Sequence, residues 1–388
     1  MSQTQAAISP RSSTATLVIP CLNEAGTLRD FLRECKEAFS NDKETDWEIL
    51  VADNGSIDGS ADIAVDEGAR VISVACEGYG SALHSGILAA RDGYVVYADA
   101  DGTYSPADAV RLLAEIRRSG ADLVVGTRIL GEIEEGAMPW LHRYLGTPVL
   151  SFLVRWLYAI PITDCNSGIR CLRRETYASW RLSGDGMEYA SAMLIHAASA
   201  GATVKEIPVT LRRSPNHRIP HLKIWRDGMR HLLTILAGAP GIFWHPGIAM
   251  LVLSLALTVP CFWGLIQVAD GVQFFGPHTQ AISIVIGFYG AAFMGVALSL
   301  YNQPRHRKPI PKLAMALTTL REDVLFWALI GFFTCFLAGG VYAFWQWSRI
   351  HYSDFAFLKF TLGLIYFTLV PAAVSLGVFQ SHLQKRTL

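Results

Sequence analysis

The chain lacks an excess of charge of either sign, and its cysteines form no paired motif. It has 388 residues with 33 basic and 33 acidic side chains, so its net charge gives no reason to expect nucleic-acid binding. Its seven cysteines include no Cys-x-x-Cys pair, which argues against a zinc site and favours reduced, structural thiols. The composition therefore argues against a nucleic-acid-binding surface and against a cysteine-based metal site.

Charged side chains are also missing from long stretches of the C-terminal part. Asp, Glu, Lys and Arg are absent from residues 232–269, 271–304, 324–348 and 360–384. Because a helix needs about 20 apolar residues to cross a bilayer, we predict membrane spans near residues 247–268, 282–301, 325–347 and 357–379. These spans define a membrane domain over residues 244–388.

The basic residues around these spans predict their sidedness. Those between the second and third spans are Arg305, Arg307, Lys308, Lys312 and Arg321, and those after the fourth are Lys385 and Arg386. Basic loops stay on the cytoplasmic side, so the C-terminus and, with four spans, the N-terminal domain are expected in the cytoplasm. The membrane would be the plasma membrane if the source is bacterial. Residues 1–13 are polar, resemble no signal peptide, and are predicted to be a disordered tail.

Residues 14–215 alternate short β-branched runs with helical patterns. Strands are predicted at residues 16–19, 48–52, 70–74, 94–98 and 121–125, and helices at residues 28–39, 61–67, 81–91 and 106–118. This alternation is typical of an α/β domain with a largely parallel sheet. In such sheets, ligands bind beyond the carboxyl ends of the strands.

Polar side chains follow several of these predicted strands. Asp99 and Asp101 come directly after the fourth strand, and two carboxylates at this spacing can hold a divalent cation against a diphosphate. Asp53 ends the second strand, and its carboxylate, which only accepts hydrogen bonds, could recognise the ring N–H of uracil or guanine. The sequence thus predicts a nucleotide-diphosphate site at this edge of the sheet.

Seven segments in order carry a resemblance to a known family. They read LVIPCLNEAGTL, VADNGSIDGS, GYGSALHSGILAA, YADADGTYSP, VVGTR, TDCNSGIRCLRRE and KEIPVTLRR. Together they resemble the inverting GT-A glycosyltransferases of the dolichyl-phosphate mannose synthase type, including bacterial polyprenyl-phosphate sugar transferases, over about residues 16–236. The resemblance implies a GT-A domain, a nucleotide-sugar donor, a Mg²⁺ or Mn²⁺ cofactor, and transfer of the sugar to polyprenyl phosphate.

The same resemblance implies roles for individual residues. Those expected at the nucleotide are Pro20, Asn23, Glu24, Asp53 and Asp99, with Arg212 and Arg213 at the diphosphate and Arg218 as an alternative to them. Asp99 and Asp101 are expected to bind the metal, together with Thr103, a weaker ligand that replaces a Gln of many relatives. Arg128 and Arg143 match positions that hold the acceptor phosphate, and Asp164, Asp101 and Arg128 are the expected catalytic residues.

The role of Asp164 stays open between a base and an orienting group. A phosphate monoester has a second pKa near 6, so a phosphate acceptor is largely ionised at neutral pH and needs little help from a base. Asp164 could instead orient the sugar or an arginine. Glu188 is a secondary candidate, and His84 is predicted to be a surface or packing residue.

Residues 216–243 are predicted to form an amphipathic region ahead of the first span. At about 100° per residue, Trp225, Met229 and Leu233 share one face with other apolar residues, while Arg230 and His231 lie on the other. Such a helix suits the membrane interface, although packing against the soluble domain is the alternative.

Three other functions compete with a polyprenyl-phosphate acceptor. Transfer to a lipid hydroxyl, such as that of diacylglycerol, would require a true base. A processive polysaccharide synthase would require a QxxRW motif, and Phe152 stands where its Gln is expected. A non-catalytic transport subunit would usually carry ionisable residues within its spans. For the donor, a UDP-sugar such as UDP-glucose is favoured, with GDP-mannose possible.

Overall fold

A computed structural model describes residues 13–91, 93–180, 182, 186–214, 224–262, 266–269, 272–303, 310–349 and 355–387. The chain forms two compact units, Met1–Ile235 and Leu236–Leu388. The predicted tail, except for Ser13, and residues Arg218, Arg305, Arg307 and Lys308 lie outside the described residues. The domain boundary was expected after residue 215, whereas the two units divide within a helix, after Ile235.

The first unit is built on one seven-stranded mixed sheet. Its strands are β1 (Ser13–Cys21), β2 (Thr45–Asp53), β3 (Arg70–Ser73), β4 (Tyr94–Tyr97), β5 (Leu123–Thr127), β6 (Arg170–Arg173) and β7 (Val204–Pro208). They lie in the order β3-β2-β1-β4-β6-β5-β7. Only β6 runs antiparallel to its neighbours, β4 and β5. The expected α/β architecture is confirmed, with a mixed rather than purely parallel sheet.

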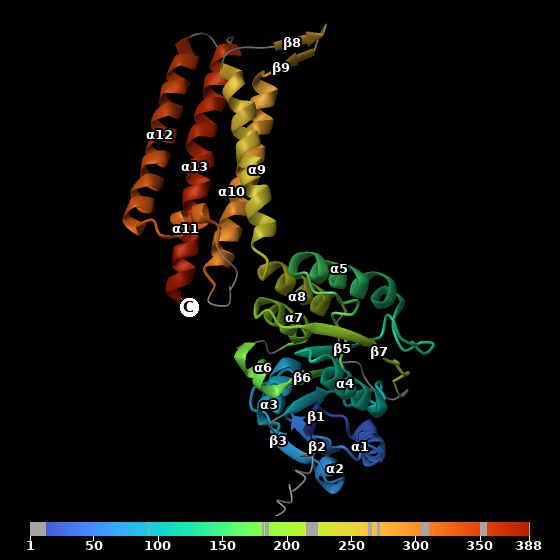
Figure 1. Cartoon of the computed structure of the whole chain (residues 1–388). Helices are drawn as coiled ribbons and strands as arrows, with labels where there is room; N and C mark the ends of the chain where they lie inside the picture. The colour runs from blue at the N-terminus through green and yellow to red at the C-terminus, as the bar shows by residue number, and fades with distance from the viewer. Residues whose placement is uncertain are drawn as a thin grey trace, which may run out of the picture. The chain divides into compact units, whose positions relative to one another are not determined.

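Helices cover both faces of this sheet (Figure 1). They are α1 (Ala25–Ser40), α2 (Ser60–Asp66), α3 (Tyr79–Ala89), α4 (Pro106–Ser119), α5 (Thr147–Tyr158), α6 (Arg174–Trp180), α7 (Tyr189–Ser199) and α8 (Ile224–Ala237), with a π-helical turn η1 (His142–Gly146) before α5. Side chains alternate along the strands: Leu17 and Ile19 pack in the core with α1 and α4, whereas Val18 meets α3 at Gly86. This period of two fixes which residues reach the core.

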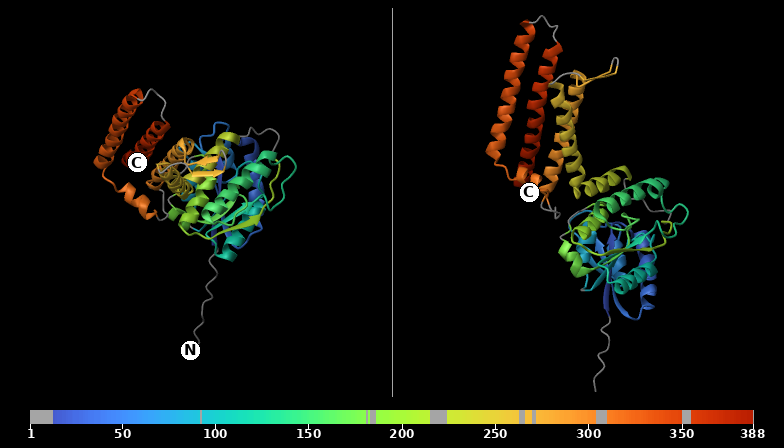
Figure 2. Two further views of the ribbon diagram at one scale, coloured as in Figure 1. Left: turned by 90° about the horizontal axis from the view of Figure 1, so that it is seen from above. Right: turned by 45° about the horizontal axis from the view of Figure 1, so that its top comes forward.

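The helices α5 and α8 lie side by side in the first unit, as both views show (Figures 1 and 2). The hydroxyl of Tyr158, at the end of α5, donates a hydrogen bond of 2.5 Å to the carbonyl of Ile235 in α8. Most of α8 thus belongs to the same compact unit as the sheet.

The second unit consists mainly of long apolar helices. Its elements are α9 (Gly241–Thr258), the 3₁₀ turn η2 (Val259–Phe262), the hairpin β8 (Ile266–Ala269) and β9 (Val272–Phe274), α10 (Pro277–Tyr301), α11 (Lys312–Thr318), α12 (Glu322–Arg349) and α13 (Phe355–Thr387). The helix α10 packs against α9 and α13, and α13 packs against α12.

Four of these helices are long and apolar enough to cross a membrane. The candidate spans are Gly241–Cys261, Pro277–Tyr301, Asp323–Gln346 and Thr361–His382. The expected end of the first span at residue 268 is wrong, because Ile266–Ala269 forms a strand of the hairpin. A continuous apolar sequence did not distinguish a helix from a β-branched hairpin strand there.

Candidate functional site

The carboxyl ends of three parallel strands meet at one edge of the sheet. Cys21 at the end of β1 pairs with Asp53 at the end of β2, and Val18 pairs with Tyr97 at the end of β4. A cavity of about 880 Å³ opens at this edge. Its lining includes Pro20, Glu24, Asp99, Asp101 and Arg128. The strand register therefore brings together residues that are far apart in the sequence.

The acidic pair is oriented by neighbouring hydroxyl groups. The Tyr79 hydroxyl donates to Asp99 Oδ1 at 2.8 Å, and burial raises the pKa of Tyr79 well above its usual value, so this proton stays in place. Asp101 Oδ1 accepts hydrogen bonds from the backbone N–H and the Oγ1 of Thr103, at 3.1 and 2.6 Å. Thr103 is absent from the described lining of the cavity. The geometry therefore favours a role for Thr103 in orienting Asp101 over direct metal ligation.

A metal ion at this pair would need ligands from a substrate. Within the described part of the chain, no three His, Cys, Asp or Glu side chains gather closely enough to hold a metal ion. Magnesium is commonly bound by one or two carboxylates together with substrate phosphates. Asp99 and Asp101, which line the same cavity, fit that pattern.

Gly168 is required by the close approach of Asp99. The antiparallel pairing of Tyr97 with Arg170 continues past the strand ends and sets residue 168 across from residue 99. A Cβ at residue 168 would lie 2.1 Å from Asp99 Oδ2. The Gly168 backbone N–H also donates to the Tyr104 hydroxyl at 2.9 Å. Any larger residue would displace the carboxylate.

Arg128, which lines the cavity, forms a two-pronged ion pair with Asp164. Arg128 Nε lies 2.6 Å from Asp164 Oδ2, its Nη2 lies 2.8 Å from Oδ1, and its backbone N–H donates to Oδ2 at 3.1 Å. The Asp164 side chain is fully buried and that of Arg128 is 15% exposed. Burial alone would raise the pKa of Asp164, but Arg128 lowers it below its usual range. Asp164 is therefore an ionised partner of the arginine, poorly suited to accept a proton.

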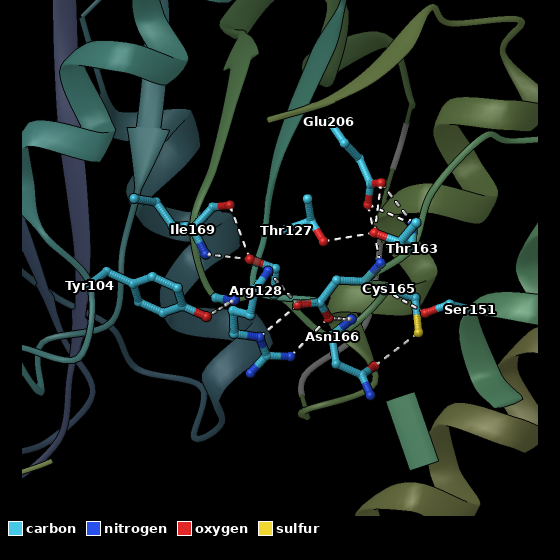
Figure 3. Close-up of polar contacts among 12 residues, drawn as sticks. Tyr104, Thr127, Arg128, Ser151, Thr163, Cys165, Asn166, Ile169 and Glu206 are labelled. Atoms are coloured by element: carbon cyan, nitrogen blue, oxygen red, sulfur yellow. Dashed lines mark hydrogen bonds and ion pairs between the residues drawn. The ribbon is translucent and has the colours of Figure 1, made fainter. Parts of the chain in front are cut away.

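Glu206 holds the loop that carries Asp164, a role that sequence reasoning missed. Its carboxylate accepts hydrogen bonds from the backbone N–H groups of Thr163 and Asp164, the shortest at 2.8 and 3.1 Å, and from Thr163 Oγ1 at 3.0 Å (Figure 3). Burial raises the pKa of Glu206. Glu206 lies within β7, and its position in the segment KEIPVTLRR does not reveal its hydrogen-bond partners.

The expected nucleoside residues divide into two groups. Pro20 and Glu24 line the cavity. The Asp53 carboxylate instead accepts hydrogen bonds from the backbone N–H groups of Gly55 and Ser56, both at 3.3 Å. Asn23 Oδ1 accepts a hydrogen bond from the backbone N–H of Ile57 at 2.9 Å. Neither Asp53 nor Asn23 belongs to the described lining. Their side chains shape the loop after β2, beside the cavity.

Three of the expected arginines, Arg143, Arg212 and Arg213, are absent from the described lining of the cavity, although His142 and Leu145, which lie close to Arg143 in the chain, belong to it. Arg212 pairs with Glu34 of α1 at 2.7 Å and donates to Ser105 Oγ at 3.0 Å. Arg213 is exposed. Arg143 is exposed and stacks on Tyr144, with 5.5 Å between the guanidinium carbon and the ring centre.

The secondary candidates also have definite environments. His84 Nδ1 lies 2.6 Å from the Tyr177 hydroxyl, in agreement with the expected packing role. Glu188 Oε1 accepts the backbone N–H of Gly186 at 3.3 Å, and Glu188 lines a second cavity, of about 920 Å³, that shares Asn54 and Gly78 with the first.

One wall of the first cavity is apolar. It is formed by η1 and α5, which contribute Leu145 and Val149, and by α8, which contributes Trp225 and Met229. These four side chains are 51%, 46%, 79% and 53% exposed, respectively. The site thus combines carboxylates and a buried cation with an accessible apolar surface.

Residues 16–179 match the model of a protein family described as glycosyl transferase family 2. The low-salt glycan biosynthesis hexosyltransferase Agl6 of Haloferax volcanii is 34% identical over 267 residues, 69% of this chain, and the match spans 63% of that relative, less than two thirds of its length. The dolichyl-phosphate hexose transferase of the same organism is 31% identical over 163 residues, 42% of this chain and 69% of the relative. A crystal structure of glucosyl-3-phosphoglycerate synthase from Mycobacterium tuberculosis is 24% identical, covers 58% of this chain and 79% of that one, and superposes with a TM-score of 0.47.

Proposed function

The chain belongs to glycosyl transferase family 2, and we propose that it transfers a sugar from a nucleoside-diphosphate sugar to polyprenyl phosphate. The product is a polyprenyl-monophosphate sugar. A UDP-sugar, UDP-glucose first among them, is the favoured donor, with GDP-mannose as the alternative. In the reaction an acceptor phosphate oxygen bonds to the anomeric carbon while the bond to the diphosphate breaks, and the nucleoside diphosphate leaves with the electron pair.

The observation that carries this proposal is the largely buried Arg128 side chain, 15% exposed, which lines the same cavity as the acidic pair and an apolar wall. A guanidinium presents a planar fork that suits phosphate oxygens. Asp164 fixes the orientation of that fork through two hydrogen bonds, at 2.6 and 2.8 Å. A ligand with an anionic head and an apolar tail matches this combination.

The state of Asp164 supports a phosphate acceptor over a hydroxyl acceptor. A hydroxyl must lose a proton as it attacks, and a base of depressed pKa assists that poorly. A phosphate monoester is already largely ionised at neutral pH. The proposed role of Asp164 is therefore to position Arg128, and Arg128 holds the acceptor. The relative described as a dolichyl-phosphate hexose transferase is consistent with such an acceptor.

We assign the divalent cation, Mg²⁺ or Mn²⁺, to Asp99 and Asp101. When bound, the ion supplies positive charge that offsets the charge of the leaving diphosphate. Tyr79 and Thr103 hold the two carboxylates in position. Pro20 and Glu24, on the same side of the cavity lining, are the proposed contacts of the nucleoside.

The proposed setting is a membrane surface. Four helices are apolar and long enough to span a bilayer, and α8 exposes Trp225, Met229 and Leu233, which suits a helix in the interface. We propose that the catalytic unit and the C-terminus are cytoplasmic, so that the cavity meets the headgroup of the lipid acceptor.

A product analysis tests the proposal. The purified full chain is incubated with Mg²⁺ or Mn²⁺, a panel of UDP- and GDP-sugars, and either polyprenyl phosphate, free polyprenol or diacylglycerol. The lipid product is then identified by mass spectrometry. A mass increase of one hexose on polyprenyl phosphate supports the proposal. Glycosylated diacylglycerol, without labelled polyprenyl phosphate, would assign the enzyme to a hydroxyl acceptor instead.

A further inference from the structure

The helix α8 buries two polar residues, Asp227 and His231, while Arg226 and Arg230 are exposed on the same helix. Trp225, Met229 and Leu233 are 79%, 53% and 59% exposed, whereas Asp227 and His231 are 3% and 5% exposed. The last two residues lie one turn apart and both line the cavity. Burying ionisable groups costs free energy unless they are well paired or serve a site. The burial of Asp227 and His231 beside the cavity therefore points to a function for these two residues.

His231 is held by one ring nitrogen. Its Nδ1 lies 2.7 Å from the Oγ of Ser191 in α7, which is fully buried. Because His231 lines the cavity while Nδ1 contacts Ser191, Nε2 is the ring nitrogen that can meet a ligand. The hydrogen bond to Ser191 therefore fixes both the ring and the direction of Nε2.

The protonation state of His231 favours a neutral ligand at this residue. Burial lowers the pKa of His231 to about 4, opposed by Glu188 and Asp227 and assisted by Arg170, so the ring is uncharged at neutral pH. An uncharged imidazole offers no charge attraction to a phosphate. The Asp227 carboxylate lies 3.6 Å from Arg226 Nε, and Arg226 and Arg230 are the residues of α8 in this lining that could attract an anion. Both His231 and Asp227 can bond to a hydroxyl.

We propose that His231, oriented by Ser191, binds a hydroxyl group of the transferred sugar and helps select which sugar is accepted. This inference rests on the proposed function. Among the reactants, the diphosphate and the acceptor phosphate are anionic, and the base and the isoprenoid tail carry no hydroxyl group. Hydroxyl groups are found on the sugar and on the ribose, and we assign the contact with His231 to the sugar.

Binding measurements on the full chain in detergent separate these two sources. Calorimetry with Mg²⁺ gives the dissociation constants of UDP and of a UDP-hexose for the wild type, H231A, H231Q and S191A. We expect H231A to weaken UDP-hexose binding about tenfold, the loss of one well-oriented hydrogen bond, and UDP binding less than twofold. H231Q, whose amide nitrogen can replace Nε2, is expected to recover part of the affinity, and S191A to lose about threefold. H84A is the matched control, because it removes a similar histidine–hydroxyl contact away from the cavity lining.

A second measurement addresses selectivity. The ratio of kcat/KM for the preferred donor and its C4 epimer is expected to fall at least fivefold in H231A and to stay unchanged in H84A. An equal loss of affinity for UDP and UDP-hexose would overturn the proposal and move the contact to the ribose. Unchanged affinity and selectivity in H231A would also overturn it. A wild-type chain that binds UDP-hexose without glycosylating polyprenyl phosphate would instead contradict the proposed function alone.

Discussion

Replacing Asp164 by Asn tests how the buried cation of the site is held in place. The change keeps the shape of the side chain, removes its negative charge, and turns one accepting oxygen into a donor. In the native site both oxygens of Asp164 accept hydrogen bonds from Arg128, three bonds in all. In the variant, the new side-chain amide N–H₂ faces an N–H group of Arg128, so one hydrogen bond is lost. The Arg128 guanidinium also loses its negatively charged partner.

The magnitude follows from the burial of the two groups. Removing one partner of a buried ion pair costs about 3–5 kcal/mol. The Arg128 side chain keeps 15% of its surface exposed, so water in the cavity compensates part of this cost, and we expect the free energy of unfolding to fall by about 2–4 kcal/mol. For a unit of this size, each 1 kcal/mol corresponds to roughly 2–4 °C in the melting temperature, which gives a decrease of roughly 4–16 °C.

The assay is thermal unfolding of the full chain in detergent, followed by intrinsic fluorescence, with D46N as the control. Asp46 also pairs with an arginine, Arg91, at 3.2 Å, but their side chains are 56% and 52% exposed, so D46N is expected to cost less than 0.5 kcal/mol, about the value of a surface pair. Equal melting temperatures for D164N and D46N would refute the reasoning.

The pH dependence of unfolding tests whether Asp164 stabilises the fold as a carboxylate. Burial opposes ionisation of Asp164, but Arg128 lowers its folded-state pKa below the usual value. The stabilisation by the carboxylate is therefore present above about pH 4, its usual pKa, and is lost as the pH falls through the folded-state pKa. The difference between wild type and D164N should be constant from pH 5 to 8 and shrink in more acidic buffer. A difference that grows on acidification would contradict the pairing.

Four further substitutions, together with metal removal, test the rest of the site. Asp101→Ala should abolish transfer without changing the fold, Asp99→Ala should be nearly as severe, and EDTA should mimic both, as followed by radiolabel in the lipid product; full activity in excess EDTA would rule out the metal role. Arg128→Lys keeps the charge but loses the fork, so it should raise the KM for polyprenyl phosphate about tenfold while the dissociation constant of the nucleotide changes little. Gly168→Ala should reduce kcat at least a hundredfold because its Cβ collides with Asp99, whereas Gly26→Ala, which meets nothing within 4 Å, should leave kcat unchanged.

The strand ends of the site could be predicted from sequence because they depend on local patterns. Alternating apolar runs located β1, β2 and β4, and parallel strands necessarily bring their carboxyl ends to one edge. The acidic pair then followed from Asp99 and Asp101 being the first polar residues beyond β4. Nothing beyond the order of residues was needed for this part.

The other half of the site depends on an element that carries little local signal. β6 has four residues, RCLR, with arginine at both ends, and its antiparallel direction is set by tertiary pairing with β4 and β5. That pairing places Gly168 against Asp99 and Asp164 against Arg128. A charged four-residue strand is not detectable from periodicity, and neither are the hydrogen bonds by which Glu206 holds Thr163 and Asp164.

The arginines illustrate a finer limit. Arg212 and Arg213 follow the buried Leu211, and neither belongs to the described cavity lining. Arg212 instead pairs with Glu34 of α1, which lies 178 residues earlier in the chain. A motif predicts that a basic residue is present, whereas its partner depends on the tertiary fold.

Because of the placement of α8, the two units cannot be exchanged independently at every junction between them. This single helix supplies a wall of the cavity through residues 225–232 and then continues past Ile235 into the second unit. A chimera that exchanges the C-terminal part before Ile224 would import a foreign cavity wall together with the foreign spans, whereas an exchange after Ala237 would leave the wall intact. If α8 helps to select the sugar, as proposed above, an exchange at the first junction would change sugar selection together with the candidate spans, whereas an exchange at the second would change the spans alone.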